Sequence, residues 1–230
     1  MKNPHISEDL YFGLELSTLA MSQFKDYDPN TIFGFTEPVE SFINYIKSKL
    51  RLQKITNLKE AKDMLFFYAN DKMYNNLFSK LRAQINLMTL SEYQEHLEGV
   101  ENPIDYKRYQ LVKTYQFDLG RQGIKAYDVS EYVKLTRLCG LCGLLSENEV
   151  RNRIWDIAII TKKWFTSWND FHKAVMIGEQ FAEAYGHQNH NILAPEVRSH
   201  NLWYKLSNEA KLEHSPFLGQ QLFSDGIVNH

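Results

Sequence analysis

Apolar side chains recur along nearly the whole chain with the spacing of an α-helix. Residues 39–50 are a clear case, because their apolar side chains stand three or four positions apart and would share one helical face. Alternating apolar and polar residues, the pattern typical of a strand, are rare. The β-branched runs at residues 31–33 and 157–161 are too short or too helical in context to indicate a sheet. The pattern predicts an all-α fold of about eight to ten helices.

Capping signals indicate where these helices begin. Ser7 precedes the first one, which we expect to continue toward Pro29, and Thr36 just before Pro38 predicts the start of the next. The remaining N-terminal signals in the first half of the chain are Asn57, Thr89 and Asn102.

The clearest unit is an αα-hairpin followed by a third helix, between Ala126 and Phe181. Asp128 is interpreted as the N-cap of the first helix rather than as a catalytic carboxylate. Gly143 fits the left-handed position that ends this helix. Ser146, with a glutamate three residues later, predicts a capping box, and Ser167 predicts the cap of the third helix.

We expect a single compact domain, because no low-complexity linker interrupts the chain. Within residues 1–230, residues 1–120 form an N-terminal helical part and residues 121–186 form the hairpin core. Residues 187–230 are predicted to be a loop and a C-terminal helix near residues 202–212.

Composition is consistent with a globular protein. Hydrophobic residues make up 43% of the chain and the net charge is only −2, whereas disordered chains are poor in hydrophobic residues and highly charged. No apolar run approaches the ~20 residues of a membrane-spanning helix, and the N-terminus has no continuous apolar signal core. Two cysteines cannot form a disulfide scaffold. We therefore expect a soluble, cytoplasmic protein that does not bind membranes.

Charge is distributed unevenly along the chain. Residues 1–50 contain four basic and seven acidic side chains, as do residues 167–230, whereas residues 121–166 contain eight basic and five acidic ones. This bias is too weak to indicate a phosphate backbone as partner. The turn after Leu138 resembles a helix-turn-helix, but the helix that follows it lacks a dense basic face, so a nucleic-acid partner is not expected. Its candidate phosphate contacts are Arg151, Arg153, Lys162 and Lys163.

Two groups of metal-ligating residues have simpler interpretations. Cys139 and Cys142 form a CxxC motif, but they fall in the last turn of a helix, where the dipole disfavours a thiolate, and no second pair of ligands matches them. We interpret them as packing residues. His187, His190 and His200 lie in a predicted solvated loop. No catalytic, cofactor or metal site is therefore predicted.

Aromatic residues offer a further candidate. Trp155, Trp164 and Trp168 could form a platform for bases or a small ligand, but we expect them to pack into the core. Trp203 and Tyr204, on the last predicted helix, could dock on the domain or on a partner.

Three segments of the hairpin region resemble a bacterial family, the domain-of-unknown-function family 1266. They are Ala126–Ser130, Gly143–Ser146 and Phe165–Phe171. The resemblance implies helical caps, a turn glycine and core aromatics, but no reaction. Two positions depart from the family pattern, because Glu131 and Glu179 stand where the family commonly has arginine.

The resemblance also provides the functional expectation. Family members are similar to bacterial proteins encoded beside secreted toxins, which implies an immunity-type protein that neutralises a toxin by direct binding. Weak candidates for partner contact are Glu131, Glu179, Trp203 and Tyr204. The alternative is a helical enzyme or nucleic-acid-associated protein whose site is assembled from scattered residues.

Overall fold

The computed structural model of the chain describes residues 7–70 and 73–184, and this part contains helices and no strand. The all-α prediction is confirmed. In chain order the helices are α1 (Glu8–Glu15), α2 (Thr18–Met21), α3 (Glu40–Leu52), α4 (Leu58–Ala69), α5 (Tyr74–Asn86), α6 (Leu90–Glu98), α7 (Pro103–Tyr115), α8 (Lys125–Leu141), α9 (Glu147–Trp164) and α10 (Trp168–Glu183).

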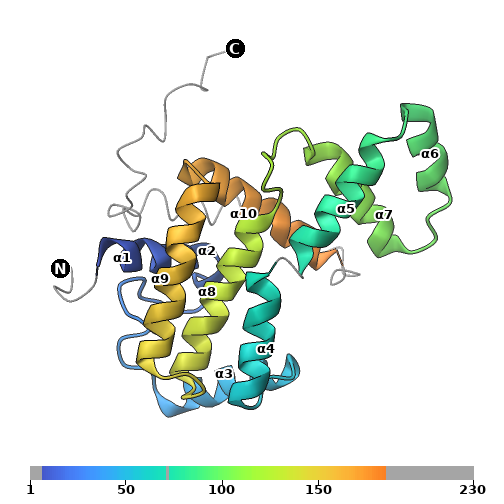
Figure 1. The fold of residues 1–230 in the computed structure, drawn as a ribbon. Coiled ribbons are helices and arrows are strands. Elements are labelled where there is room, and N and C mark those ends of the chain that lie inside the picture. The colour runs from blue at the N-terminus through green and yellow to red at the C-terminus, as the bar shows by residue number, and fades with distance from the viewer. Residues whose placement is uncertain (1–6, 71–72, 185–230) are drawn as a thin grey trace.

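Helix α8 is the centre of the fold. It forms the predicted hairpin with α9, α4 lies along its other side, and α10 packs across it, while α1 covers α9 (Figure 1). Helices α5, α6 and α7 form a lobe at one side, joined to the rest through contacts of α5 with α8 and α10 and of α7 with α10. Buried residues occur on every face of α8, as expected for a helix covered all round. The buried apolar side chains form one contiguous core.

The turn between α8 and α9 has the predicted glycine. Gly143 adopts φ +75°, and its N–H donates to the carbonyl of Gly140 at 2.9 Å. The N–H of Leu144 donates to the carbonyl of Cys139, also at 2.9 Å. These two bonds define a Schellman motif, so the end of α8 is encoded locally.

The predicted N-caps of α9 and α10 are confirmed. Ser146 Oγ accepts from the N–H of Glu149 at 3.3 Å, and the Glu149 carboxylate accepts from the N–H of Ser146 at 3.0 Å. These bonds and the nearby Lys62 lower the pKa of Glu149 to about 2. Ser167 Oγ accepts from the N–H of Asp170 at 3.1 Å. Caps predicted from the first half of the chain are also present at Ser7, Asn57, Thr89 and Asn102.

The prediction that Asp128 caps its own helix is wrong. Helix α8 begins earlier, at Lys125, which places Asp128 inside the first turn with only 1% of its surface exposed. Its Oδ2 accepts from the backbone N–H of Asn75 at 3.0 Å, in the first turn of α5. Helix α5 has no capping side chain of its own, so the carboxylate of Asp128 meets the positive end of that helix dipole.

The N-terminal region differs from the prediction in two further ways. The first predicted helix is divided into α1 and α2, because the hydroxyl of Ser17 bonds the carbonyl of Leu14 at 3.1 Å and Arg137 donates to both residues. Helix α3 begins at Glu40 with Val39 as its N-cap, so Thr36 is not a cap. The Thr36 hydroxyl instead donates to a carboxylate oxygen of Asp28 at 3.0 Å.

Arg137 holds the N-terminal segment against α8. Its side chain is fully buried, and its guanidinium donates to acceptors that all lie between residues 14 and 32. Two are hydroxyls, those of Ser17 and Tyr27, each at 3.0 Å. The others are main-chain carbonyls, those of Leu14, Asp28, Pro29, Thr31 and Ile32. We call this arrangement the Arg137 clasp.

None of the helices in the described part of the chain is long and apolar enough to cross a membrane. The C-terminal helix predicted near residues 202–212 lies outside the described residues.

Candidate functional site

A concavity among the described residues lies between α2, α8 and α10. It has a volume of about 420 Å³, within the range of roughly 300–1,000 Å³ for ligand pockets. We call it the α8–α10 cavity. Its lining residues are Leu19, Ala20 and Gln23 near α2, Tyr127, Ser130, Glu131 and Lys134 on α8, and Val175, Met176, Glu179 and Glu183 on α10.

Helical spacing places the polar residues of this cavity together. On α8 the lining positions are separated by three, one and three residues, which brings them to one face. On α10, Glu179 and Glu183 are one turn apart. Gly178 lets the two helices approach closely, because a Cβ added there would contact Tyr127, with the Cγ only 2.8 Å away.

The cavity is predominantly acidic. Three glutamates and one lysine carry its formal charges. Lys134 Nζ lies 2.5 Å from Glu131 Oε1, and the two side chains are only 17% and 13% exposed. Burial, followed by the charge of Glu131, raises the pKa of Tyr127 well above its usual value, so this phenol stays protonated beside the carboxylates.

A smaller cavity of about 260 Å³ adjoins the first one. The two cavities share Gln23, Glu131 and Lys134, so the ion pair forms part of the boundary between them. Tyr68 lines the smaller cavity, and burial followed by the charge of Glu131 raises the pKa of its phenol far above normal. The negative charge of Glu131 therefore raises the pKa of a tyrosine in each of the two cavities.

The structure brings together two of the four residues proposed for partner contact. Glu131 and Glu179, the positions that depart from the family pattern, both line the α8–α10 cavity. Trp203 and Tyr204 lie outside the described residues. The sequence analysis missed Ser130 and Lys134, although both stand at helical spacing from residues already under consideration.

The cysteines are separate from this cavity. Cys139 is fully buried, and burial raises the pKa of its thiol to about 12, while burial also raises the pKa of the half-buried Cys142. This agrees with the interpretation of both as packing residues. No group of three or more potential metal ligands occurs among residues 7–70 and 73–184. The candidate histidines His187, His190 and His200 lie beyond that part of the chain.

The three tryptophans have different surroundings. Trp168 is fully buried and stacks on His172 with ring centroids 5.0 Å apart, as a core residue should. Trp164 is half-buried beneath the ammonium of Lys125, 3.8 Å from the ring centre. Trp155 is 44% exposed, so the expectation that it packs into the core is wrong.

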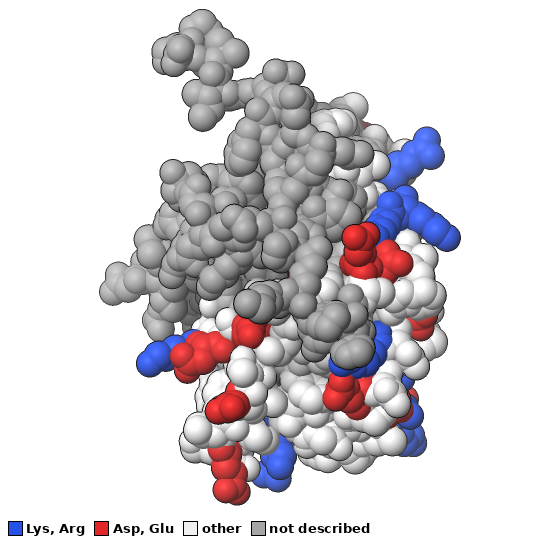
Figure 2. All heavy atoms as spheres, turned by 90° about the vertical axis from the view of Figure 1, so that its left-hand side faces the viewer, with Lys and Arg blue, Asp and Glu red and all other residues white. Residues whose placement is uncertain are grey.

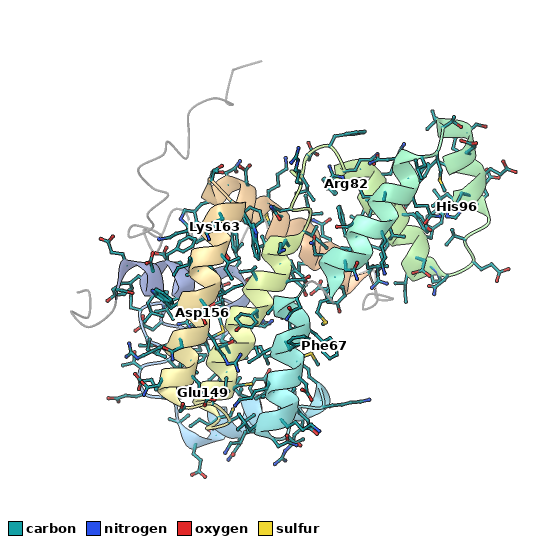
Figure 3. All side chains as sticks on the ribbon, viewed as in Figure 1. Phe67, Arg82, His96, Glu149, Asp156 and Lys163 are labelled. Atoms are coloured by element: carbon teal, nitrogen blue, oxygen red, sulfur yellow. The ribbon has the colours of Figure 1, made fainter. Side chains whose placement is uncertain are left out.

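Two of the four candidate basic residues of α9 pair with neighbouring acids. Arg151 pairs with Glu147 at 2.6 Å, and Lys162 pairs with Asp9 at 2.5 Å. Lys163 is exposed near one end of the helix (Figure 3). On the face that carries α1 and α9, acidic and basic side chains are interspersed over the described surface (Figure 2). This is unlike the single-sign face of a protein that tracks a phosphate backbone.

Comparison with known families extends the resemblance seen in the hairpin region. The family described as "Protein of unknown function (DUF1266)" matches residues 54–218. The chain belongs to this family. The DUF1266 match begins just before α4 and includes α4 to α10, whereas α1, α2 and α3 precede it. No curated protein and no solved structure is significantly similar to the chain.

The DUF1266 boundary divides the Arg137 clasp. Arg137 lies inside the family-matched part, and all of its acceptors lie in the segment that precedes it. The α8–α10 cavity is divided in the same way, because Leu19, Ala20 and Gln23 come from that segment. The described site is therefore built jointly by the family-matched part of the chain and the segment that precedes it.

Proposed function

We propose that this DUF1266 protein is a cytoplasmic protein-binding module of the immunity type, which neutralises a bacterial toxin by direct binding. The observation that supports this most is the α8–α10 cavity, in which Glu131, Glu179 and Glu183 gather beside a protonated phenol. A recessed acidic site of this kind suits a basic group projecting from a partner protein.

The acids of the cavity are recessed, and this decides which of the two proteins supplies the concave surface. Glu131 has a side chain only 13% exposed, so it cannot project into the active-site groove of a toxin. The immunity-type protein instead supplies the concave surface, and the partner supplies the projecting group. Complementary charge of this kind speeds encounter at low salt and fixes the orientation of the complex.

Two of the four candidate phosphate contacts on α9 weigh against a nucleic-acid partner. Arg151 and Lys162 already pair with acids of the same chain, at 2.6 and 2.5 Å. A phosphate contact would have to displace those acids.

The test is co-expression of the chain with the protein encoded beside it. We expect the chain to rescue cells from that toxin and to co-purify with it, in a complex that weakens as salt is raised. Replacing a charge in a desolvated pair costs about 2–5 kcal/mol, so Glu131→Gln should weaken the complex at least about tenfold. Glu98→Gln is the matched control, because Glu98 is exposed on α6 in the separate lobe and should change the affinity little.

Two results would refute the proposal. One is a neighbouring gene product that is harmless alone while the purified chain turns over a metabolite, which would favour an enzyme. The other is equal loss of binding in Glu131→Gln and Glu98→Gln, which would mean that overall charge, and not the cavity, governs the interaction.

A further inference from the structure

Helix α3 and the turn that follows it form a basic end of the molecule. Residues 41–59 contain no acidic side chain and five exposed cationic ones: Lys47, Lys49, Arg51, Lys54 and Lys59. Within the described part of the chain, none of these five cations forms an ion pair. Lys47 and Arg51 stand one helical turn apart, a spacing at which like charges destabilise a helix. The fold therefore leaves this positive charge uncompensated.

Helix α6 and the loop that follows it carry the opposite charge. Residues 83–106 contain no lysine or arginine and five acidic side chains: Glu92, Glu95, Glu98, Glu101 and Asp105. Lys113 of α7 lies over the ring of Tyr93, 5.1 Å from its centre, on the covered side of α6. Glu95 and Glu98 are exposed in the last turn of α6, where the helix dipole disfavours a carboxylate. Among the described residues, neither of them has an ion-pair partner that would offset this cost.

Both helices leave most of their surface uncovered, and they lie at opposite ends of the molecule (Figure 1). In α3 only Ile46 and Leu50 are buried out of thirteen residues, and in α6 only Tyr93 is buried out of nine. Leu52, the last residue of α3, is 79% exposed among the cations. One chain therefore presents two uncovered helix faces of opposite charge, which are too far apart to meet each other.

We propose that the exposed face of α3 in one chain binds the exposed face of α6 in a second copy, so that copies associate head to tail. A second copy is the occupant because the chain itself supplies both complementary surfaces, with Lys49 and Arg51 on one and Glu95 and Glu98 on the other. Opposite charges speed encounter and fix the orientation of the two chains. The two surfaces differ, so the contact is heterologous, and it continues until a ring closes or a filament grows. This inference goes beyond the proposed function, because neither surface includes a residue that lines the α8–α10 cavity.

The experiment is sedimentation velocity of the full chain over a range of protein concentrations, at about 50 mM and about 500 mM salt. We expect the mean mass to rise with concentration at low salt and to return to that of the monomer at high salt, because exposed charges are screened. Lys49→Glu should weaken the association. Lys163→Glu is the matched control, because it makes the same change of charge at an exposed position of α9 and should leave the association unchanged.

Two double variants separate complementary charge from net charge. Lys49→Glu with Arg51→Glu reverses the basic surface, and Glu95→Lys with Glu98→Lys reverses the acidic one; each should weaken the association at least about tenfold. The second pair adds four positive charges and takes the net charge from −2 to +2, so its magnitude does not change. This variant should fold at least as stably as the natural chain, because the dipole of α6 favours cations in its last turn. An equimolar mixture of the two double variants should associate, since each keeps the natural surface that the other needs.

Several results would overturn the inference. They are a chain that stays monomeric at every concentration in low salt, a loss of association that is as large in Lys163→Glu as in Lys49→Glu, an association that only one of the double variants abolishes, and a mixture that does not associate. Binding of duplex DNA or of anionic lipid vesicles by a monomeric natural chain, abolished by Lys49→Glu with Arg51→Glu, would assign the surface of α3 to a different partner and would also overturn it. Each of these results leaves the co-purification test of the proposed function intact, because the cavity is unchanged in every variant.

Discussion

Replacing Arg137 with methionine tests whether the clasp stabilises the whole domain. Methionine is shorter but replaces the apolar stem of the arginine side chain, and it removes every guanidinium hydrogen bond. Five of these bonds are 3.2 Å or shorter, to Leu14, Ser17, Tyr27, Thr31 and Ile32.

Opposing contributions set how much free energy of unfolding is lost in Arg137→Met. A hydrogen bond to a charged group contributes about 1.5–3 kcal/mol, so five such bonds would sum to about 7.5–15 kcal/mol. Removing a buried charge recovers several kcal/mol of desolvation penalty, but it leaves carbonyls without a donor. The net loss should be about 3–5 kcal/mol, the range for breaking a buried charged network. This is a large share of the 5–15 kcal/mol that typically stabilises a folded domain.

Urea unfolding followed by far-ultraviolet circular dichroism measures this loss by linear extrapolation. Arg151→Met is the matched control: its guanidinium is part of a surface ion pair with Glu147, so it should cost less than about 1 kcal/mol. Hydrogen exchange should also become faster in residues 14–32. If Arg137→Met costs no more than the control, or if exchange in that segment is unchanged, the clasp does not stabilise the domain.

Three further predictions concern the packing and titration of α8 and α10. Gly178→Ala forces a methyl against Tyr127 and should lower the free energy of unfolding by about 1–3 kcal/mol; unchanged urea midpoints would refute the close helix approach. Burial lowers the pKa of His172 to about 3. As the pH falls below about 6.5, this imidazole is protonated in the unfolded chain but not in the folded chain, so the free energy of unfolding decreases from pH 6.5 toward pH 3. Between pH 7 and 5 the natural chain should lose about 2 kcal/mol more than His172→Phe, and equal losses would contradict a buried neutral imidazole. Burial raises the pKa of Cys139 to about 12, so its thiol should react with iodoacetamide at pH 8 only after denaturation; rapid labelling of the folded chain, located by mass spectrometry, would show otherwise.

Local signals in the sequence were sufficient for much of the fold. The capping box at Ser146 and the turn at Gly143 depend on residues within five positions of each other, and both are present as predicted. Helix spacing alone also predicted the all-α class. Such features require no knowledge of the tertiary structure.

Long-range contacts account for the errors. Asp128 has the sequence signature of a cap, but it caps a helix whose first turn lies 53 residues away. Arg137 divides the first predicted helix from a distance of more than 100 residues. No local pattern encodes either contact, because both depend on how the helices pack.

The candidate site was partly predictable. Glu131 and Glu179 were identified as departures from a family pattern, yet only the crossing of α10 over α8 brings them to one cavity. Ser130 had helical spacing as its only signal, because a hydroxyl without a hydrogen bond is recognised only when its surroundings are known. The role of Gly178 in the close approach of α10 to α8 likewise depends on Tyr127, the side chain that faces it.

The Arg137 clasp has a consequence for how this chain can change over time. Most of its acceptors are main-chain carbonyls, and every amino acid supplies the same carbonyl. The hydrogen bonds of the clasp therefore depend mainly on the backbone path of residues 14–32 and little on which side chains that segment carries. The carbonyl contacts of the clasp should therefore survive point substitutions in this segment far better than the insertion or deletion of a single residue, which would shift the carbonyls away from a guanidinium fixed in the core.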